Sequence, residues 1–320
     1  MMNISARKKT NKAKLPNEVA QRNLLAIPPK NSSSSIQDKF GNQVKELSKK
    51  GNFLDRKFGD KFIVLHKLNG IYFAISIPKN ECLPNAFDYK VFVGLLALSK
   101  NNNYKIEFNS IGEIVRKLGF SNTGSVYERI KDSLDKWSFI QFWIIEDDGK
   151  ELLGYEDSMM DILYRQNKRT LHYSKIQVIF SNNFINRINS DKKISFVDYE
   201  IIKKLTTESA MVIYSYLRSF DSKLKYGYKL IRNIKKLNND LLLVKSKRKD
   251  KQISCIKKAI ELINATHGEI VYKIKMEKDN VIFTKREEIK SIKNKKNKRK
   301  IILPSGMPLS FAKQYGISIS

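Results

Sequence analysis

The sequence has 320 residues, of which 41% are hydrophobic, and this length allows about two domains with buried cores. Its 61 lysines and arginines against 32 aspartates and glutamates give a formal net charge of +29, which favours a polyanionic partner because each neutralised phosphate releases counterions. No stretch approaches the roughly 20 apolar residues of a membrane-spanning helix, and the basic N-terminus lacks the apolar core of a signal peptide, so we expect a cytoplasmic protein without a membrane partner.

The two ends of the chain are polar and basic. Residues 1–52 are low in aromatic residues and contain Pro28-Pro29 and the serine run Ser32–Ser35, so they cannot bury enough surface to fold alone. At the other end, Lys290–Lys300 is an almost unbroken basic run. We predict a disordered basic N-terminal arm over residues 1–52 and a basic C-terminal tail over residues 291–320, which adds nonspecific phosphate affinity.

Residues 53–188 are predicted to form a first domain. It opens with a hairpin of Lys61–Leu65 and Ile71–Ile77 around Asn69-Gly70, a strong turn signal. The elements that follow are, in chain order, a helix capped by Asp88 and reaching Leu98, a strand Tyr104–Phe108, a helix Ser110–Leu118 capped by Asn109 and ended by Gly119, a helix from the turn Phe120–Gly124 to about Trp137, and strands Phe139–Ile145 and Leu171–Phe180. This order is that of a winged helix-turn-helix.

Residues 189–290 are predicted to repeat that order. The expected elements are helices Phe196–Leu205, Thr206–Phe220, Leu230–Leu237 and Lys247–Ala265, then strands Glu269–Met276 and Val281–Lys285. The sequence therefore predicts an α+β fold of two tandem winged helix-turn-helix domains with disordered basic tails at both ends.

Three segments resemble RepA-like plasmid replication initiators. Thr206–Leu217 is similar to a helix of that family in which small and apolar residues precede a Leu/Ile-Tyr pair. Lys258–Ile263 and the hairpin after it are similar to the recognition helix and wing of the family's second domain, and Asp88–Ser99 resembles the opening helix of its first domain. The resemblance covers roughly Phe53 to Lys290.

The resemblance implies a protein that binds repeated double-stranded DNA sites at a plasmid origin, helps to open the adjacent AT-rich DNA and recruits host replication proteins such as a helicase or initiator. It also implies a homodimer formed through the first domain, while the second domain reads sequence. The abundance of Lys, Asn and Ile indicates an AT-rich, bacterial genome. The resemblance further implies a plasmid- or nucleoid-associated protein.

The last predicted helix is the main candidate for reading DNA. With Ile253, Ile256, Ile260 and Ile263 directed inward, basic and hydroxyl side chains fall on the opposite face, where they can meet phosphates or base edges in a major groove. The candidate contacts here are Lys247, Arg248, Lys251, Ser254 and Lys258. The alternative is an ordinary solvated lysine face. The wing adds Lys273, Lys275 and Lys278, although outward positions of a hairpin are commonly charged without binding anything.

The corresponding helix of the first domain carries a different pattern. Its outward face holds Glu128, Asp132 and Asp135, which repel phosphates, and this agrees with a first domain used mainly for partner contact. Its first turn can donate to a phosphate at the positive end of the helix or simply cap it. The candidate auxiliary contacts are Ser121, Asn122, Thr123, Ser125, Arg129 and Lys131.

Catalytic motifs are missing from the sequence. It contains no GxxxxGK[ST] phosphate loop, and its histidines, His66, His172 and His267, are isolated, unlike clustered metal ligands. Cys82 and Cys255 lack CxxC spacing and are expected to be reduced packing residues. We therefore expect neither an enzyme nor a cofactor or metal site.

Three other functions remain open on the sequence. A transcriptional regulator built from the same two domains is the nearest alternative, distinguished by a single promoter site in place of repeats. A nuclease or relaxase would require divalent metal. A nonspecific RNA-binding or nucleoid protein would show no preference between DNA sequences.

Overall fold

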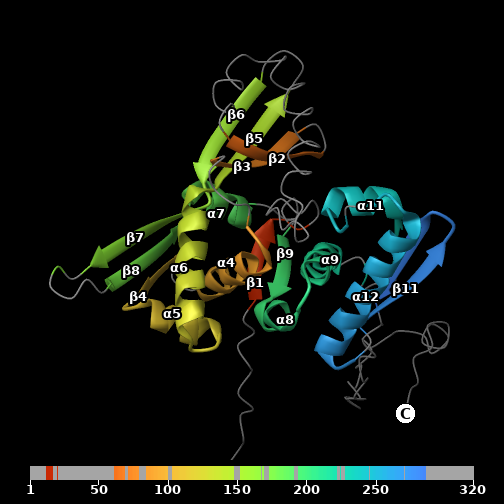
Figure 1. Cartoon of the computed structure of the whole chain (residues 1–320). Coiled ribbons are helices and arrows are strands. Elements are labelled where there is room, and N and C mark those ends of the chain that lie inside the picture. The colour runs from red at the N-terminus through yellow and green to blue at the C-terminus, as the bar shows by residue number, and fades with distance from the viewer. Residues whose placement is uncertain are drawn as a thin grey trace, which may run out of the picture. The chain divides into compact units, whose positions relative to one another are not determined.

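The computed structural model describes residues 12–16, 20, 61–68, 71–78, 84–99, 103–147, 152–166, 168, 173–190, 194–221, 224, 228–244, 246–269 and 271–285. All of them belong to one compact unit that spans residues 1–286. Helices alternate with several small sheets (Figure 1), so the α+β class predicted from the sequence is confirmed. The predicted C-terminal tail and most of the N-terminal arm lie outside the described residues.

The first half of the chain contains a three-helix unit with a three-stranded sheet. Its elements are α4 (Ala86–Ser99), β4 (Lys105–Phe108), α5 (Ile111–Leu118), α6 (Gly124–Phe139), β7 (Met160–Gln166) and β8 (Tyr173–Phe180). The strands pair antiparallel in the order β4-β8-β7. The strand that comes last in the sequence of this unit, β8, is thus the central strand of its sheet.

The second half repeats this arrangement. Its elements are α9 (Glu208–Ser219), β10 (Leu230–Asn233), α11 (Ile234–Leu241), α12 (Lys249–His267), β11 (Tyr272–Glu277) and β12 (Asn280–Lys285). The sheet order is β10-β12-β11, again with the last strand in the centre and the strand that precedes the second helix on one edge. The two halves therefore share both the order of elements along the chain and the order of strands in the sheet.

A separate four-stranded sheet corrects the predicted wing of the first half. Its strands are β2 (Lys61–Leu68), β3 (Ile71–Pro78), β5 (Gln141–Asp147) and β6 (Leu152–Ser158), in that order. The predicted hairpin is confirmed, since Leu68 pairs with Ile71 across the turn. However, β5 pairs with β3 and β6, and the strand beside β8 is β7, which the sequence analysis did not predict. The buried Trp143 Nε1 donates to Ser76 Oγ at 2.8 Å and helps to hold β5 in this sheet.

A short strand lies within the segment predicted to be a disordered arm. β1 (Lys12–Pro16) pairs antiparallel with β9 (Ile194–Asp198) and packs against α4. Ala13 and Leu15 are fully buried, because apolar and basic residues alternate with the two-residue period of a strand. The prediction of disorder is therefore wrong for these five residues, which complete a core supplied by distant parts of the chain.

Two predicted helix caps of the first half shift by a few residues. α4 begins at Ala86 because Asn85 Oδ1 accepts hydrogen bonds from the amides of Phe87 and Asp88. Asp88 is therefore not the cap; its carboxylate accepts from the Asn85 amide at 2.8 Å and from Lys136 Nζ at 2.6 Å. The next cap is Ser110, whose hydroxyl accepts from the Glu113 amide, and not Asn109.

Two predicted helices of the second half begin later than expected. Phe196 lies in β9, and the helix that follows is α8 (Tyr199–Lys204) with Asp198 as its cap. Leu230–Asn233 is an edge strand paired with β12, so α11 begins only at Ile234, where Asn233 Oδ1 accepts from the Lys236 amide. Strand pairing thus overrides the helical periodicity of these two segments. One further helix, α7 (Asn182–Ser190), was not predicted.

The predicted inward-facing residues form the core. Val126, Ile130, Leu134 and Trp137 of α6 are all buried, as are Ile256, Ile260 and Ile263 of α12, while Ile253 is partly buried.

Two buried hydrogen bonds join the two halves. Tyr89 OH and Ser215 Oγ lie 2.7 Å apart, and Tyr199 OH donates to the Leu118 carbonyl at 2.8 Å. Burial raises the pKa of Tyr89 to about 12, which keeps its hydroxyl neutral.

Candidate nucleic-acid interface

The helix α12 presents the predicted lysines to solvent. It runs from Arg248, its N-cap, to Gly268, whose left-handed φ of 73° ends it. Because its isoleucines face the core, Lys251 and Lys258 lie on the opposite, exposed face with the half-buried Ser254 between them. Lys247 precedes the helix and is exposed beside Arg248. The structure therefore brings Lys251, Ser254 and Lys258 onto one face and places Lys247 and Arg248 at its N-terminal end.

Ion pairs divide the candidate cations into two groups. Arg248 contacts Asp250 at 2.8 Å and Lys275 contacts Glu277 at 2.7 Å, and these pairs raise the pKa of both cations. Among the described residues, no carboxylate lies within ion-pair distance of four others, which we name the unpaired lysines: Lys251, Lys258, Lys273 and Lys278. These four ammonium groups can meet phosphates without first breaking an ion pair.

The hairpin β11–β12, which we call the wing, is held against α12 at two points. At the C-terminal end of α12, Asn264 Oδ1 accepts from the amides of Val271 and Tyr272 at 2.9 and 3.0 Å, and its Nδ2 donates to the Tyr272 carbonyl at 2.8 Å. At the N-terminal end, Lys249 Nζ lies 2.7 Å from Asp279 Oδ1 in the wing turn. Sequence analysis missed both contacts, since neither residue stands out from its neighbours.

The outward face of the wing is basic, as predicted. Lys273 and Lys275 are exposed, while the alternating Tyr272, Ile274 and Met276 are wholly or partly buried. Lys278 is exposed in the turn, with a left-handed φ of 50°. The lysines of the wing and those of α12 therefore belong to one unit, in which the contacts of Asn264 and Lys249 hold the wing against the helix. We call this the braced unit.

The first turn of α6 holds the auxiliary candidates. Ser121, Asn122, Thr123 and Ser125 are exposed. Thr123 is the N-cap but its side chain makes no capping hydrogen bond, whereas Asn122 Oδ1 accepts from Tyr127 OH. Side-chain capping, the alternative role that the sequence left open, therefore does not describe Thr123.

Arg129 and Lys131 differ in their surroundings. Arg129 is exposed, and its guanidinium carbon lies 3.9 Å from the ring centroid of Phe87, a cation–π contact that fixes the side chain on α4. Lys131 is half-buried. Arg129 is thus the better placed of the two to offer a planar, oriented cation.

The acidic face of α6 is less exposed than predicted. Glu128 and Asp132 are exposed, but Asp135 is half-buried and accepts a hydrogen bond from Tyr164 OH at 2.6 Å. Its role is therefore to join α6 to β7. In all, α6 carries three acidic and three basic side chains, whereas α12 carries four lysines against one aspartate and one glutamate. The two helices differ in charge as the sequence indicates.

A further group of cations surrounds the turn between α5 and α6. Arg116, Lys117 and Lys204 are exposed, and Lys203 Nζ lies 2.9 Å from the place a Cβ at Gly119 would occupy. Lys90 Nζ donates to the Lys203 carbonyl at 2.9 Å, and burial together with the nearby Arg129 lowers its pKa. Sequence analysis missed this group because basic residues in a last helical turn are expected for dipole reasons alone.

The described residues carry no group of three or more His, Cys, Asp or Glu side chains that could hold a metal ion. Cys255 is half-buried, and burial raises the pKa of its thiol. None of the described helices is long and apolar enough to cross a bilayer.

Comparison with known proteins finds matches among solved structures. No protein-family model and no curated protein sequence matches the chain. The crystal structure of selenomethionine derivatives of domain 2 and domain 3 of RctB aligns with a TM-score of 0.54 at 12% identity, over 84% of this chain and 98% of that one. A second structure of RctB domains 2–3 aligns at 0.47 and 14% identity, over 70% and 89% of the two chains. The chain is therefore similar in fold to domains 2 and 3 of RctB.

Proposed function

We propose that this protein is a replication initiator that binds double-stranded DNA through two tandem winged helices and has no catalytic chemistry of its own. The observation that carries the proposal is the braced unit of α12 and the wing, which presents four unpaired lysines. A major groove accepts one α-helix, and a hairpin fixed beside that helix can reach the adjacent phosphates.

Two features support an initiator over other DNA-binding proteins. One is the repetition of the same element and strand order in two halves, in a fold similar to RctB domains 2 and 3. The other is the resemblance of three segments to RepA-like plasmid initiators. We accordingly propose repeated sites at a plasmid origin as the target, local opening of that DNA as the outcome, and host replication proteins as partners.

We assign different roles to the two halves. Residues 189–290 are the main reader, because α12 is basic on its outward face. Residues 53–188 serve dimerisation and auxiliary DNA contact, because α6 has balanced charge and its exposed donors are concentrated in its first turn and at Arg129. Sedimentation that finds a monomer at every concentration, with and without DNA, would remove dimerisation from the proposal.

A nuclease-protection footprint tests the function directly. The purified protein is placed on the DNA that flanks its own gene, at near-physiological salt and with excess competitor DNA. Regularly spaced protection over direct repeats is expected. Protection of one promoter palindrome would make the protein a transcriptional regulator, and uniform weak coverage would make it a nonspecific nucleic-acid binder.

A further inference from the structure

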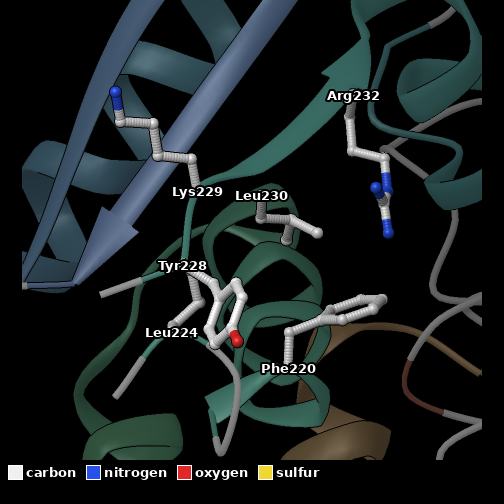
Figure 2. A pocket seen from close by; sticks show the side chains of 6 residues that line it. All are labelled: Phe220, Leu224, Tyr228, Lys229, Leu230 and Arg232. Carbon is white, nitrogen blue, oxygen red and sulfur yellow. The ribbon is translucent and has the colours of Figure 1, made fainter. Parts of the chain in front are cut away.

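A solvent-facing pocket lies between the end of α9 and the edge strand β10. It has a volume of about 230 Å³ and is lined by Phe220, Leu224, Tyr228, Lys229, Leu230 and Arg232 (Figure 2). Pockets for drug-sized molecules measure about 300–1,000 Å³, so this one suits a single ring system. Tyr228 is 67% exposed, although a large aromatic side chain is usually covered.

The lining combines aromatic faces with an apolar floor. Leu224 and Leu230 are 1% and 8% exposed and close the bottom of the pocket. The ring of Phe220 is held by Tyr216, whose ring centroid lies 5.1 Å away, while Tyr228 stands free in solvent. In the view of Figure 2 the rings of Phe220 and Tyr228 both appear below Leu230. The exposed ring of Tyr228 therefore offers a face on which a flat, uncharged ring can stack.

The pocket is also positively charged. The Arg232 guanidinium carbon lies 5.0 Å from the Phe220 ring centroid, and its Nε donates to Tyr216 OH at 2.7 Å, so the group is oriented in advance. Among the described carboxylates none lies within ion-pair distance of Arg232, and the neighbouring Asp221 is neutralised by Arg218 and Lys285. The Lys229 side chain extends away from both rings in Figure 2 and interacts electrostatically with Glu277. An apolar aromatic surface beside an oriented cation fits a nucleotide, whose base is flat and whose phosphate is anionic.

We propose that this pocket binds an unpaired base of single-stranded DNA, which stacks on Tyr228 while Arg232 meets the adjacent phosphate. Stacking on aromatic side chains beside cations is how proteins hold single strands without reading their sequence. The inference rests on the proposed function, because an initiator that opens DNA produces unpaired strands. The sheet order β10-β12-β11 puts the pocket at the edge opposite the wing strand β11, so duplex and single strand have separate contacts.

The test compares single-stranded and duplex binding of the full chain by fluorescence anisotropy. The single-stranded probe is labelled oligothymidylate of about 15 nucleotides, and the duplex probe is the DNA that flanks the gene. Tyr228→Ala is expected to weaken oligothymidylate binding about tenfold and to leave duplex binding unchanged. Tyr228→Phe keeps the ring and should keep the affinity. Ile231→Ala is the matched control, since Ile231 is 52% exposed on β10 but lies between the lining residues Leu230 and Arg232 and so faces the other side of the strand.

The outcomes separate this inference from the proposed function. Duplex binding without oligothymidylate binding, or equal effects of Tyr228→Ala and Ile231→Ala, would overturn the pocket assignment and leave the initiator proposal standing. Failure of the wild-type chain to bind either probe would overturn both. If sedimentation showed that Tyr228→Ala abolishes self-association while oligothymidylate binding persists, the pocket's occupant would be a second copy of this chain, and the inference would be wrong.

Discussion

Lys249 of α12 and Asp279 of the wing turn form an ion pair, with Nζ and Oδ1 2.7 Å apart and side chains 50% and 74% exposed. This contact holds the carboxylate beside the N-terminal end of the proposed reading helix, and the lysine lowers the pKa of Asp279. In the free protein the pair therefore neutralises a cation at the end of the helix where phosphates are expected to bind. The energetic contribution of such an exposed pair to folding is small.

The Asp279→Asn variant separates the two roles of this pair. It removes a carboxylate that repels phosphates and releases Lys249, so duplex affinity should rise severalfold. The slope of log K against log salt concentration should steepen by about 0.9. Anisotropy titrations over a range of salt concentrations measure both quantities. Weaker binding at unchanged slope would instead show that the pair mainly positions the wing.

Replacing Lys251 and Lys258 together by Ala should weaken duplex binding. It should also flatten the slope of log K against log salt concentration by about 1.8, because each lost phosphate contact removes about 0.9 from that slope. Lys105→Ala is the control, since this exposed lysine lies on β4 of the other half. An unchanged slope in the double variant would remove both lysines from the interface.

Asn264→Ala should reduce the free energy of unfolding by about 1–2 kcal/mol, because it leaves two amides and a carbonyl at the start of β11 without partners. Urea denaturation followed by circular dichroism measures the loss. Thr266→Val, which removes one hydrogen bond to the Leu262 carbonyl within the same helix, is the comparison and should cost less. Equal losses would contradict a special role for Asn264.

Gly94→Ala should destabilise the protein by about 1–3 kcal/mol through overpacking. A Cβ at this position would lie 2.6 Å from Leu118 Cδ2 and 2.8 Å from the Tyr199 ring, so α4, α5 and α8 could not approach as closely. Gly124→Ala is the opposite case, because a Cβ there meets nothing within 4 Å, and alanine should stabilise the protein by about 0.4–1 kcal/mol by restricting the unfolded chain. Thermal unfolding that ranked the two variants in reverse would refute this account of the packing.

Stability should fall as the pH drops below about 6.5, through His267. Burial and the nearby Arg218 lower its pKa, against the opposing effects of Asp198 and Glu269, so the unfolded chain binds a proton more readily than the folded one. The contribution is fully present above 6.5, the ordinary pKa of histidine, and is lost as the pH falls towards the lower folded value.

The His267→Phe variant isolates this dependence. It keeps a ring beside Tyr214, whose centroid lies 5.8 Å from that of His267, and loses no described hydrogen bond of the buried Nε2. Between pH 7.5 and 5.5 the variant should lose less stability in urea than the wild type. Parallel curves would show that other groups account for the whole pH dependence.

The sequence predicted the buried faces of α6 and α12 well, because their periodic isoleucine, leucine and valine residues are decided by local amphipathicity. It failed where a segment's partner is distant. Leu230–Asn233 has a helical pattern but pairs with Phe283–Asn280, and β5 was assigned to the wrong hairpin because nothing local shows that its partner is β3. Tertiary pairing overrides propensity at such positions.

The sequence predicted which residues of the candidate interface are exposed, but not the contacts that hold its elements together. The faces occupied by Lys251, Lys258 and Lys273 follow from helix and strand periods, so they could be placed from the sequence. The brace through Asn264 and the pocket beside Tyr228 could not, since both depend on contacts between elements whose spacing along the chain carries no signal.

The pairing of β1 with β9 joins Lys12 to Asp198, which are among the most widely separated partners in the chain. Contacts of such high sequence separation form slowly, because a long loop must close before they stabilise anything. During synthesis, Ala13 and Leu15 therefore remain without their partner strand until β9 has emerged. The first half of the protein can complete its core only after translation has passed into the second.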